Sequence, residues 1–322
     1  MTTSTWILGD IGGTHSRFAV LFDGDIIHHA QFKNKDQAGL AHVLRKYLQT
    51  LPADKLPQNL LLAVAGPVQA DQSVHLTNLG WDIHATQLAK EIEFTRVHLV
   101  NDFTALAMSM PSLQPEDLAQ VGDGAPIHGA PMAILGPGTG LGVSGLIPKH
   151  GTWAAIVGEG GHATLPAMDA READILQGLR AECKHVSAER ILSGPGLKLL
   201  YEYIAKETGH TGMAPKPEQI TQLAVSEEDP IAVEALAHFF RFLGTVAGDL
   251  ALTLGAQGGV YLAGGILPQL VDQLRQSDFR QRFICKGRYE DYLKVIPTYV
   301  ILDKLAPFRG LQAIVEEEAA HS

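Results

Sequence analysis

Residues Ile7–Arg17 read Ile-Leu-Gly-Asp-Ile-Gly-Gly-Thr-His-Ser-Arg, and this stretch decides the fold. An apolar run is followed at once by a carboxylate, Asp10, and by the glycine pair Gly12-Gly13, and a second apolar run starts at Phe18. The order predicts a strand, a tight glycine turn and a returning strand. Backbone N–H groups in such a turn can hold an anion such as phosphate, and Asp10 could hold Mg²⁺. The alternative is an ordinary hairpin closed by a Gly-Gly turn.

Length and composition indicate an ordinary globular protein. The chain has 322 residues, which at about 150 residues per domain favours two domains. Its apolar content of 46% and charged content of 19% are typical of a globular protein, and the apolar residues are enough for a large core. The formal net charge of −10 argues against non-specific nucleic-acid binding, so we expect no nucleic-acid partner.

Cysteine usage and hydropathy favour a cytoplasmic protein. Cys183 and Cys285 are far apart, form no Cys-x-x-Cys pair and suit a reducing compartment. Residues Met1–Trp6 lack the basic and apolar regions of a signal peptide. We expect no membrane segment, because no uninterrupted apolar run approaches the roughly 20 residues that span a bilayer.

The second half of the chain repeats the opening pattern. Ile7–Gly9 aligns with Ile134–Gly136, and each precedes a glycine turn and a returning strand. Farther along, Leu61–Pro67 resembles Val260–Ile266. This internal symmetry predicts a duplicated α/β domain with a cleft between the copies. Chance similarity between buried strands is the alternative.

A segment rich in proline and glycine, 111–131, separates the two halves, and we place a domain boundary at its start. The expected domains are 1–110 plus 303–322, the smaller, and 111–302, the larger. Within the segment we expect a short helix near Glu116–Gln120. Buried strands are expected at 60–64, 97–100, 132–135, 260–263 and 295–302, and the longest helix at 230–254.

Asn101 and Asp102 follow the buried strand 97–100 directly. Ligands bind at the carboxyl ends of strands in open α/β sheets. An aspartate there can accept a proton from a substrate hydroxyl, and the neighbouring asparagine can donate to one. The alternative is an Asx turn or an N-cap for the helix that starts near Phe103.

Glu159 and His162 flank the pair Gly160-Gly161, so a bending loop holds two polar side chains that can bond adjacent hydroxyls of a sugar. A lone histidine is more often structural, and His162 is one of 14. Glu189 lies at an expected helix start, where a capping or dipole-stabilising carboxylate is common.

Two further glycine turns follow buried strands, at Gly138–Gly142 and at Gly264-Gly265. A nucleotide held from two sides needs such turns in both halves. No P-loop motif occurs. Gly140–Gly145 matches Gly-x-Gly-x-x-Gly, but a dinucleotide site requires a helix after that motif, and Val143–Ile147 is typical of a strand.

Taken in order, the motifs resemble those of the bacterial glucokinase family. The resemblance runs from Gly9 to about Gly310, and the order of six motifs is far more specific than any one of them. It points to the branch without zinc, because the cysteine-rich motif and DNA-binding arm of related repressors and kinases are missing. The motifs are Gly9–Thr14, Asn101–Ala105, Gly136–Gly142, Gly158–His162, Ser187–Leu197 and Leu262–Ile266.

The resemblance implies the fold of actin and the hexokinases (ribonuclease H-like), with two duplicated α/β domains around a nucleotide cleft. It implies transfer of the γ-phosphoryl group of ATP to the 6-hydroxyl of D-glucose, with Mg²⁺ as cofactor, in a cytoplasmic enzyme that we expect to be a homodimer. Asp102 is then the general base, and Asp10 positions Mg²⁺ through water. The implied sugar-binding residues are Asn101, Asp102, Glu159, His162 and Glu189. The implied nucleotide-side residues are Gly9, Asp10, Ile11, Gly12, Gly13, Thr14, Gly138, Thr139, Gly264 and Gly265.

Two other functions fit the same residues. One is a kinase for another hexose or for an N-acetylhexosamine. The other is a non-catalytic sugar-sensing regulator, against which the presence of both Asp10 and Asp102 argues. A chaperone-like ATPase is a distant third, since no peptide-binding domain follows Gly310.

Overall fold

The computed structural model describes residues 5–35, 37–52 and 56–320. Most of the N-terminal stretch on which the signal-peptide expectation rests lies outside these ranges. The chain forms two compact units: one contains 1–113, 150–157 and 303–322, the other 114–149 and 158–302. This division differs from the expected domains in grouping 111–113 and 150–157 with the first unit.

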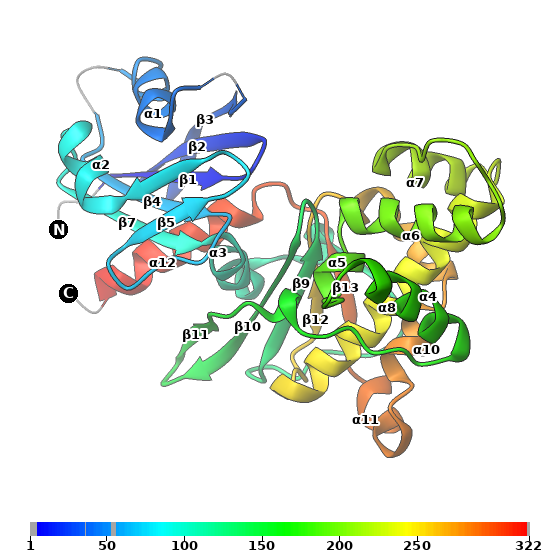
Figure 1. The fold of residues 1–322 in the computed structure, drawn as a ribbon. Helices are drawn as coiled ribbons and strands as arrows, with labels where there is room; N and C mark the ends of the chain where they lie inside the picture. The colour runs from blue at the N-terminus through cyan, green and yellow to red at the C-terminus, as the bar shows by residue number, and fades with distance from the viewer. Residues whose placement is uncertain (1–4, 36, 53–55, 321–322) are drawn as a thin grey trace. The chain divides into compact units, whose positions relative to one another are not determined.

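The first unit is a five-stranded sheet in the order β3-β2-β1-β4-β7, with helices on both faces (Figure 1). The first two strands form an antiparallel hairpin, as Ile7–Arg17 predicts, and β4 and β7 run parallel to β1. A separate two-stranded hairpin, β5 with β6, follows β4. The elements are β1 Trp6–Ile11, β2 His15–Phe22, β3 Asp25–Lys33, α1 Leu40–Leu48, β4 Asn59–Val64, β5 Ser73–Leu76, β6 Trp81–His84, α2 Ala85–Glu91, β7 Arg96–Asn101, α3 Asp102–Ser109, η2 Met110–Ser112, β11 Thr152–Ile156 and α12 Ala306–Ala320.

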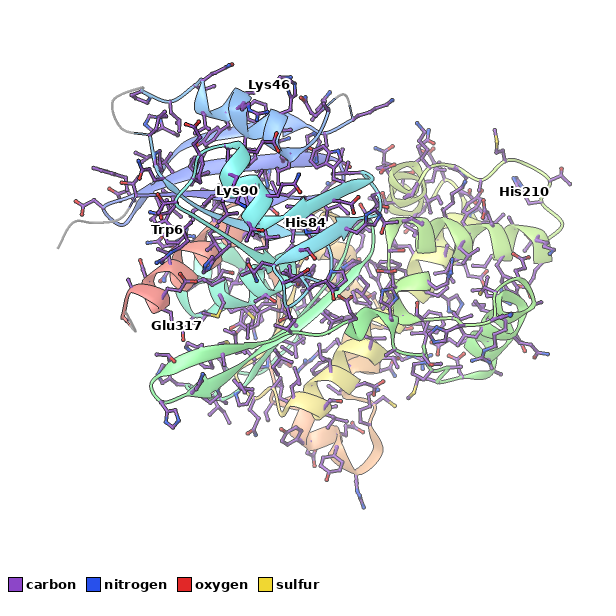
Figure 2. The ribbon with its side chains drawn as sticks, turned by 60° about the vertical axis from the view of Figure 1, so that its left-hand side comes forward. Trp6, Lys46, His84, Lys90, His210 and Glu317 are labelled. Carbon is purple, nitrogen blue, oxygen red and sulfur yellow. The ribbon has the colours of Figure 1, made fainter. Side chains whose placement is uncertain are left out.

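Alternation along β1 builds two separate cores in this unit. Ile7 and Ile11 pack on one face with residues of α1 and α2, whereas Trp6 and Leu8 pack on the other with residues of α3 and α12. Successive side chains of a strand point to opposite faces, so one short sequence serves both layers. Figure 2 shows Lys46 of α1 and Lys90 of α2 on one side of this sheet and Glu317 of α12 on the other.

The second unit contains strands in the order β10-β9-β12-β13-β8 and most of the helices. Here β10 is antiparallel to β9, while β12 and β13 are parallel to it. The elements are η3 Pro115–Asp117, β8 Leu118–Gln120, β9 Met132–Pro137, β10 Leu141–Lys149, η4 Gly160–His162, α4 Ala170–Glu182, α5 Ala188–Ile191, α6 Gly194–Glu207, α7 Pro217–Val225, α8 Pro230–Leu254, β12 Val260–Leu262, η5 Leu267–Gln269, α9 Val271–Gln276, α10 Phe279–Ile284, η6 Gly287–Tyr289, α11 Glu290–Lys294 and β13 Thr298–Ile301.

The duplication is confirmed at the level of topology. The order β2-β1-β4-β7 in the first unit matches β10-β9-β12-β13 in the second, with the same directions. The two sequence alignments disagree by two residues in the structure. Ile7 pairs with Leu60, and Ile134 pairs with Tyr261, so once Ile7 is aligned with Ile134 the residue that corresponds to Tyr261 is Leu60, not Leu62. A shift of two keeps every side chain on the same face, which is why the hydrophobic pattern alone could not detect it.

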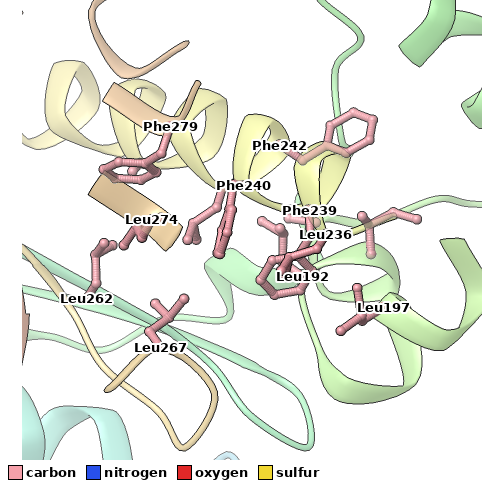
Figure 3. Close-up of a cluster of buried hydrophobic side chains, with 14 of the residues drawn as sticks. Leu192, Leu197, Leu236, Phe239, Phe240, Phe242, Leu262, Leu267, Leu274 and Phe279 are labelled. Atoms are coloured by element: carbon pink, nitrogen blue, oxygen red, sulfur yellow. The ribbon is translucent and has the colours of Figure 1, made fainter. Parts of the chain in front are cut away.

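The core of the second unit surrounds α8. Its aromatic residues Phe239 and Phe240 lie in one cluster with Leu192 and with Leu262 of β12 (Figure 3). In the described part of the chain, α8 alone is long and apolar enough to cross a membrane, but 67% of its most apolar window is buried in the protein. The apolar character of α8 is therefore accounted for by burial in this core.

The expected helix near Glu116–Gln120 is wrong in its second half. Leu118–Gln120 is a strand that pairs with β13, and only Pro115–Asp117 is helical. The sequence also indicated no helix at Phe279–Ile284 or at Glu290–Lys294, where α10 and α11 form. These elements are short, and their stability comes from distant partners rather than from local pattern.

Helix α12 packs against α3 through a glycine. A Cβ built on Gly310 would lie 1.6 Å from the backbone oxygen of Ala105. We therefore expect Gly310→Ala to force the two helices apart and to lower the free energy of unfolding by about 1–3 kcal/mol, measured by urea denaturation. Glu316→Ala, on the exposed side of the same helix, is the control and should change it by no more than about 0.5 kcal/mol. Equal effects of the two substitutions would contradict this packing.

Candidate functional site

The parallel strands of the first unit bring two of the expected site segments into one row. Ile11 pairs with Val64, and Val64 pairs with Asn101, so the carboxyl ends of β1, β4 and β7 are in register. Adjacent strands lie about 4.8 Å apart, which puts the backbones of Ile11 and Asn101 roughly 10 Å from each other. Asp10 lies one residue before this row and Asp102 one residue after it.

The first glycine turn, Gly12–Thr14, is held by a buried side chain that the sequence did not single out. Asn34 is 2% exposed; its amide nitrogen donates to the Gly12 oxygen at 2.8 Å, and its oxygen accepts from the Ser16 hydroxyl at 2.7 Å. The backbone N–H of Asn34 donates to the Thr14 oxygen at 2.9 Å. These bonds engage two carbonyls of the turn.

Two backbone N–H groups of this turn, those of Gly13 and Thr14, are available to bind a ligand. Gly12 donates its N–H to the His15 oxygen at 3.0 Å. Within the described ranges the N–H groups of Gly13 and Thr14 have no acceptor. Two adjacent unpaired N–H groups form a concavity that suits phosphate oxygens.

Asp10 forms an ion pair with Arg17, directly opposite on β2. Both Nε and Nη2 of Arg17 contact the same carboxylate oxygen, Oδ2, and Nη1 donates to the Lys304 oxygen at 2.9 Å. No role for Arg17 was predicted from the sequence, although counting residues back from the turn puts it opposite Asp10. The pair leaves Oδ1 as the oxygen of Asp10 that can face a hydrated cation.

The other residues expected on the nucleotide side of β1 pack inward. Ile11 is fully buried, and a Cβ on Gly9 would lie 2.4 Å from a methyl carbon of Leu62. Gly9 is therefore required by the packing of the sheet. A ligand could reach these two residues only through their backbone.

Asn101 is the N-cap of α3. Its side-chain oxygen accepts from the N–H groups of Phe103 and Thr104 at 2.9 and 3.2 Å, and its amide donates to the Gly66 oxygen at 3.2 Å. The N-cap alternative is therefore correct for this residue, and α3 begins at Asp102 rather than after it. One oxygen of Asp102 accepts from the Phe103 N–H at 2.9 Å, which fixes the carboxylate at the start of the helix.

In the second unit, two of the expected sugar residues come together. Nδ1 of His162 lies 3.8 Å from Oε1 of Glu189, although 27 positions separate them (189 − 162). The link is made by backbone: the N–H of Ala188 donates to the Ala163 oxygen at 2.8 Å, and Thr164 bridges Ser187. Ser187 caps the helix that carries Glu189, and this helix begins where the sequence predicts a helix start.

The loop that carries Glu159 and His162 lies directly on β10. A Cβ on Gly161 would be 2.1 Å from the Leu141 oxygen, and one on Gly160 would be 2.8 Å from the Val143 side chain. The two glycines therefore allow a contact that no other residue would permit. Glu159 is exposed, and its backbone oxygen accepts from the N–H of His162 at 3.0 Å.

A charged group anchors the far end of this loop. Arg282 of α10 contacts Asp169 Oδ2 and lies 3.0 Å from Oε1 of the fully buried Glu172, whose Oε2 accepts from the Met168 N–H. Burial raises the pKa of the Glu172 carboxyl. For Asp169 burial acts in the same direction, but hydrogen bonds from the Glu172 N–H and from Arg282 outweigh it, and its pKa is lowered.

A pocket of about 810 Å³ opens beside the second glycine turn. This volume is within the range of about 300–1,000 Å³ that is common for small-molecule sites. Of the expected nucleotide residues, Gly138, Thr139 and Gly265 line it. The remaining lining residues come from the start of α6, from α7 and its C-terminal end, and from the η5 region, and no role was predicted for them from the sequence. They are Gly194, Pro195, Leu197, Pro217, Glu218, Thr221, Gln222, Val225, Ser226, Ile266, Gln269 and Leu270.

Gly264, unlike Gly265, does not line this pocket and is required by packing. Its φ is +88°, and a Cβ would lie 2.2 Å from the Pro137 oxygen, so only glycine fits between β9 and β12 at this point. The Gly140–Gly145 motif is not a dinucleotide fingerprint, because the strand β10 follows its turn and not the helix that such a fingerprint requires.

Comparison with known proteins connects these features. The family model "Glucokinase" matches residues 7–318. The glucokinase of Paramagnetospirillum magneticum is 44% identical over 313 residues, 97% of each chain. A glucokinase structure from an Antarctic psychrotroph is 35% identical, with a TM-score of 0.86, and the match covers 98% of this chain and 100% of that one.

A more distant structure shares the fold. It is a ROK family glucokinase from Streptomyces griseus in complex with glucose and AMPPNP, 17% identical with a TM-score of 0.66, over 97% of this chain and 99% of that one. At that identity the likeness concerns the fold alone. The match of the family model and the 44% identity extend over both units, so the chain belongs to the glucokinase family.

Proposed function

We propose that the chain is an ATP-dependent glucokinase, which transfers the γ-phosphoryl group of ATP to the 6-hydroxyl of D-glucose. The observation that carries this proposal is the 44% identity to a glucokinase over 97% of both chains. Phosphoryl transfer depends mainly on positioning and charge neutralisation, for which the two glycine turns, Asp10 and Asp102 are suited.

In this proposal Asp102 is the general base for the 6-hydroxyl. Its position at the first residue of α3 and its bond from the Phe103 N–H support the role, because they hold the carboxylate in one place. Glu189 and His162 bind sugar hydroxyls as a pair, with Glu159 on the same loop. Asn101 acts chiefly by capping α3, and it can offer a sugar its second amide hydrogen.

On the nucleotide side, the N–H groups of Gly13 and Thr14 bind phosphate oxygens, and Gly138 and Thr139 complete the phosphate site. The pocket beside Gly265 takes the adenosine. Asp10 would hold Mg²⁺ through water by its Oδ1. A single carboxylate beside a phosphate-binding turn suits an ion that keeps several waters and takes its other ligands from phosphate. When bound, the ion neutralises charge on the transferring phosphoryl group.

The resemblance also supports a cytoplasmic location and a homodimer. Light scattering on the purified protein measures the second directly. A monomeric mass at working concentration would refute the dimer without affecting the proposed reaction.

A substrate panel tests the reaction. Glucose, mannose, fructose and N-acetylglucosamine are each offered with ATP, ADP and polyphosphate, and the phosphorylated sugar is quantified. We expect the highest kcat/KM for glucose with ATP. A higher kcat/KM for another sugar would reassign the enzyme to that sugar, and sugar binding without turnover would indicate the non-catalytic regulator.

Asp102→Asn tests the base. The amide keeps the size of the side chain but cannot accept a proton, so we expect kcat to fall by about 10²- to 10⁴-fold while glucose still binds. Steady-state kinetics and calorimetry with glucose measure the two effects. Asp25→Asn, an exposed carboxylate in β3 of the same unit, is the control and should keep normal turnover. Near-normal kcat in Asp102→Asn would rule out this role.

Asn34→Ala tests the support of the first glycine turn. It leaves the buried Ser16 hydroxyl and the Gly12 carbonyl without their partner, so we expect a loss of about 1–3 kcal/mol in the free energy of unfolding and a raised KM for ATP at unchanged KM for glucose. The control is Asn59→Ala, because Asn59 also donates to a backbone oxygen, that of Thr5, but at the opposite end of β1. A KM for ATP that rises equally in both variants would count against the turn.

A further inference from the structure

Gly140 lies in the second glycine turn, yet its surroundings belong to the sugar side of the unit. A Cβ built on Gly140 would lie 2.4 Å from Oε2 and 3.2 Å from Cδ of Glu189. Its φ is outside the left-handed region, so the backbone conformation does not demand glycine there. The feature that demands glycine is the space taken by the Glu189 carboxylate.

The same carboxylate is bonded to the turn itself. The N–H of Leu141 donates to Oε2 of Glu189 at 2.9 Å, while Oε1 is the oxygen that faces His162. One oxygen is thus held by backbone and the other is turned toward the histidine. The side chain is about one-third exposed, which leaves it accessible to a ligand.

We propose that Gly140 is a positioning residue of the hexose site. By lacking a side chain, it lets the Glu189 carboxylate approach Leu141 and so fixes the direction in which Glu189 accepts a sugar hydroxyl. The inference rests on the proposed function, in which Glu189 binds the hexose. It makes a residue of the nucleotide turn a determinant of glucose affinity.

Gly138 provides a matched comparison within the same turn. A Cβ there would meet no heavy atom within 4 Å, and its φ is also outside the left-handed region. An alanine at either position reduces the freedom of the unfolded chain in the same way. Only the alanine at position 140 displaces Glu189, and the clash is with the end of a flexible side chain, so the protein should still fold.

The experiment measures glucose binding to the full chain by calorimetry without nucleotide. We expect Gly140→Ala to raise the Kd for glucose about tenfold or more, the effect of losing a hydrogen bond to a charged group. Gly138 belongs to the proposed phosphate site, so it is compared only for glucose binding without nucleotide: there Gly138→Ala should keep the Kd for glucose within about twofold of the unsubstituted protein, a change of less than 0.5 kcal/mol by RT ln 2. Circular dichroism and thermal unfolding check that both variants are folded.

Two further measurements separate positioning from a general disturbance. In Gly140→Ala the KM for glucose should rise more than the KM for ATP. Adding Gly140→Ala to Glu189→Ala should weaken glucose binding no further than Glu189→Ala does alone, because position 189 then has no carboxylate for the new methyl group to displace.

The outcomes distinguish the inference from the proposed function. If Gly140→Ala binds glucose like the unsubstituted protein, or if Gly138→Ala is equally impaired, the inference is wrong and the glucokinase proposal stands. Additive effects of Gly140→Ala and Glu189→Ala would also overturn it. If the unsubstituted protein neither binds nor phosphorylates glucose, the proposed function itself fails.

Discussion

The structure depends first on the register of its parallel strands. In the first unit β1, β4 and β7 end in one row, through the pairs Ile11 with Val64 and Val64 with Asn101. Parallel pairing requires the chain to cross back between strands, so all carboxyl ends meet at one edge. Residues beyond these ends have no strand partner to pair with, so the backbone can turn. The glycine turn follows β1 at this edge, and α3 starts directly after β7. The second unit repeats the arrangement with β9, β12 and β13.

Close approach of backbones is the second constraint, and it explains most of the informative glycines. Three glycines pack directly against a backbone carbonyl oxygen of another segment: Gly161 against that of Leu141, Gly264 against that of Pro137, and Gly310 against that of Ala105. At each point a methyl group would overlap a carbonyl. Several motif glycines therefore determine how closely two segments pack, and only some of them, such as Gly13, leave an N–H for a ligand. A glycine-rich motif consequently combines packing and binding, which a pattern search does not separate.

Buried polar side chains hold the loops in place. The Asn34 side chain bonds to the Gly12 carbonyl and the Ser16 hydroxyl at the first turn. Arg282 forms ion pairs with Asp169 and Glu172 at the end of the loop that carries His162. Each such group is costly to bury without a partner, so the bonds of Asn34 and the ion pairs of Arg282 favour one position of each loop. Pre-positioned polar groups are what phosphoryl transfer needs most.

The sequence by itself determined the local elements and the motif set. Short-range properties determined the strand pair of Ile7–Arg17, the bounds of α8 and the helix start before Glu189. The family resemblance was recognisable from the order of the motifs. Only the tertiary structure decided which distant residues meet: Leu118–Gln120 as a strand on β13, Asn34 under the first turn, Arg17 on Asp10 and Lys304, the pocket of α6 and α7, and Gly140 against Glu189. The reason is that each of these contacts joins segments whose separation along the chain is unrelated to the period of a helix or a strand, so no local pattern encodes it.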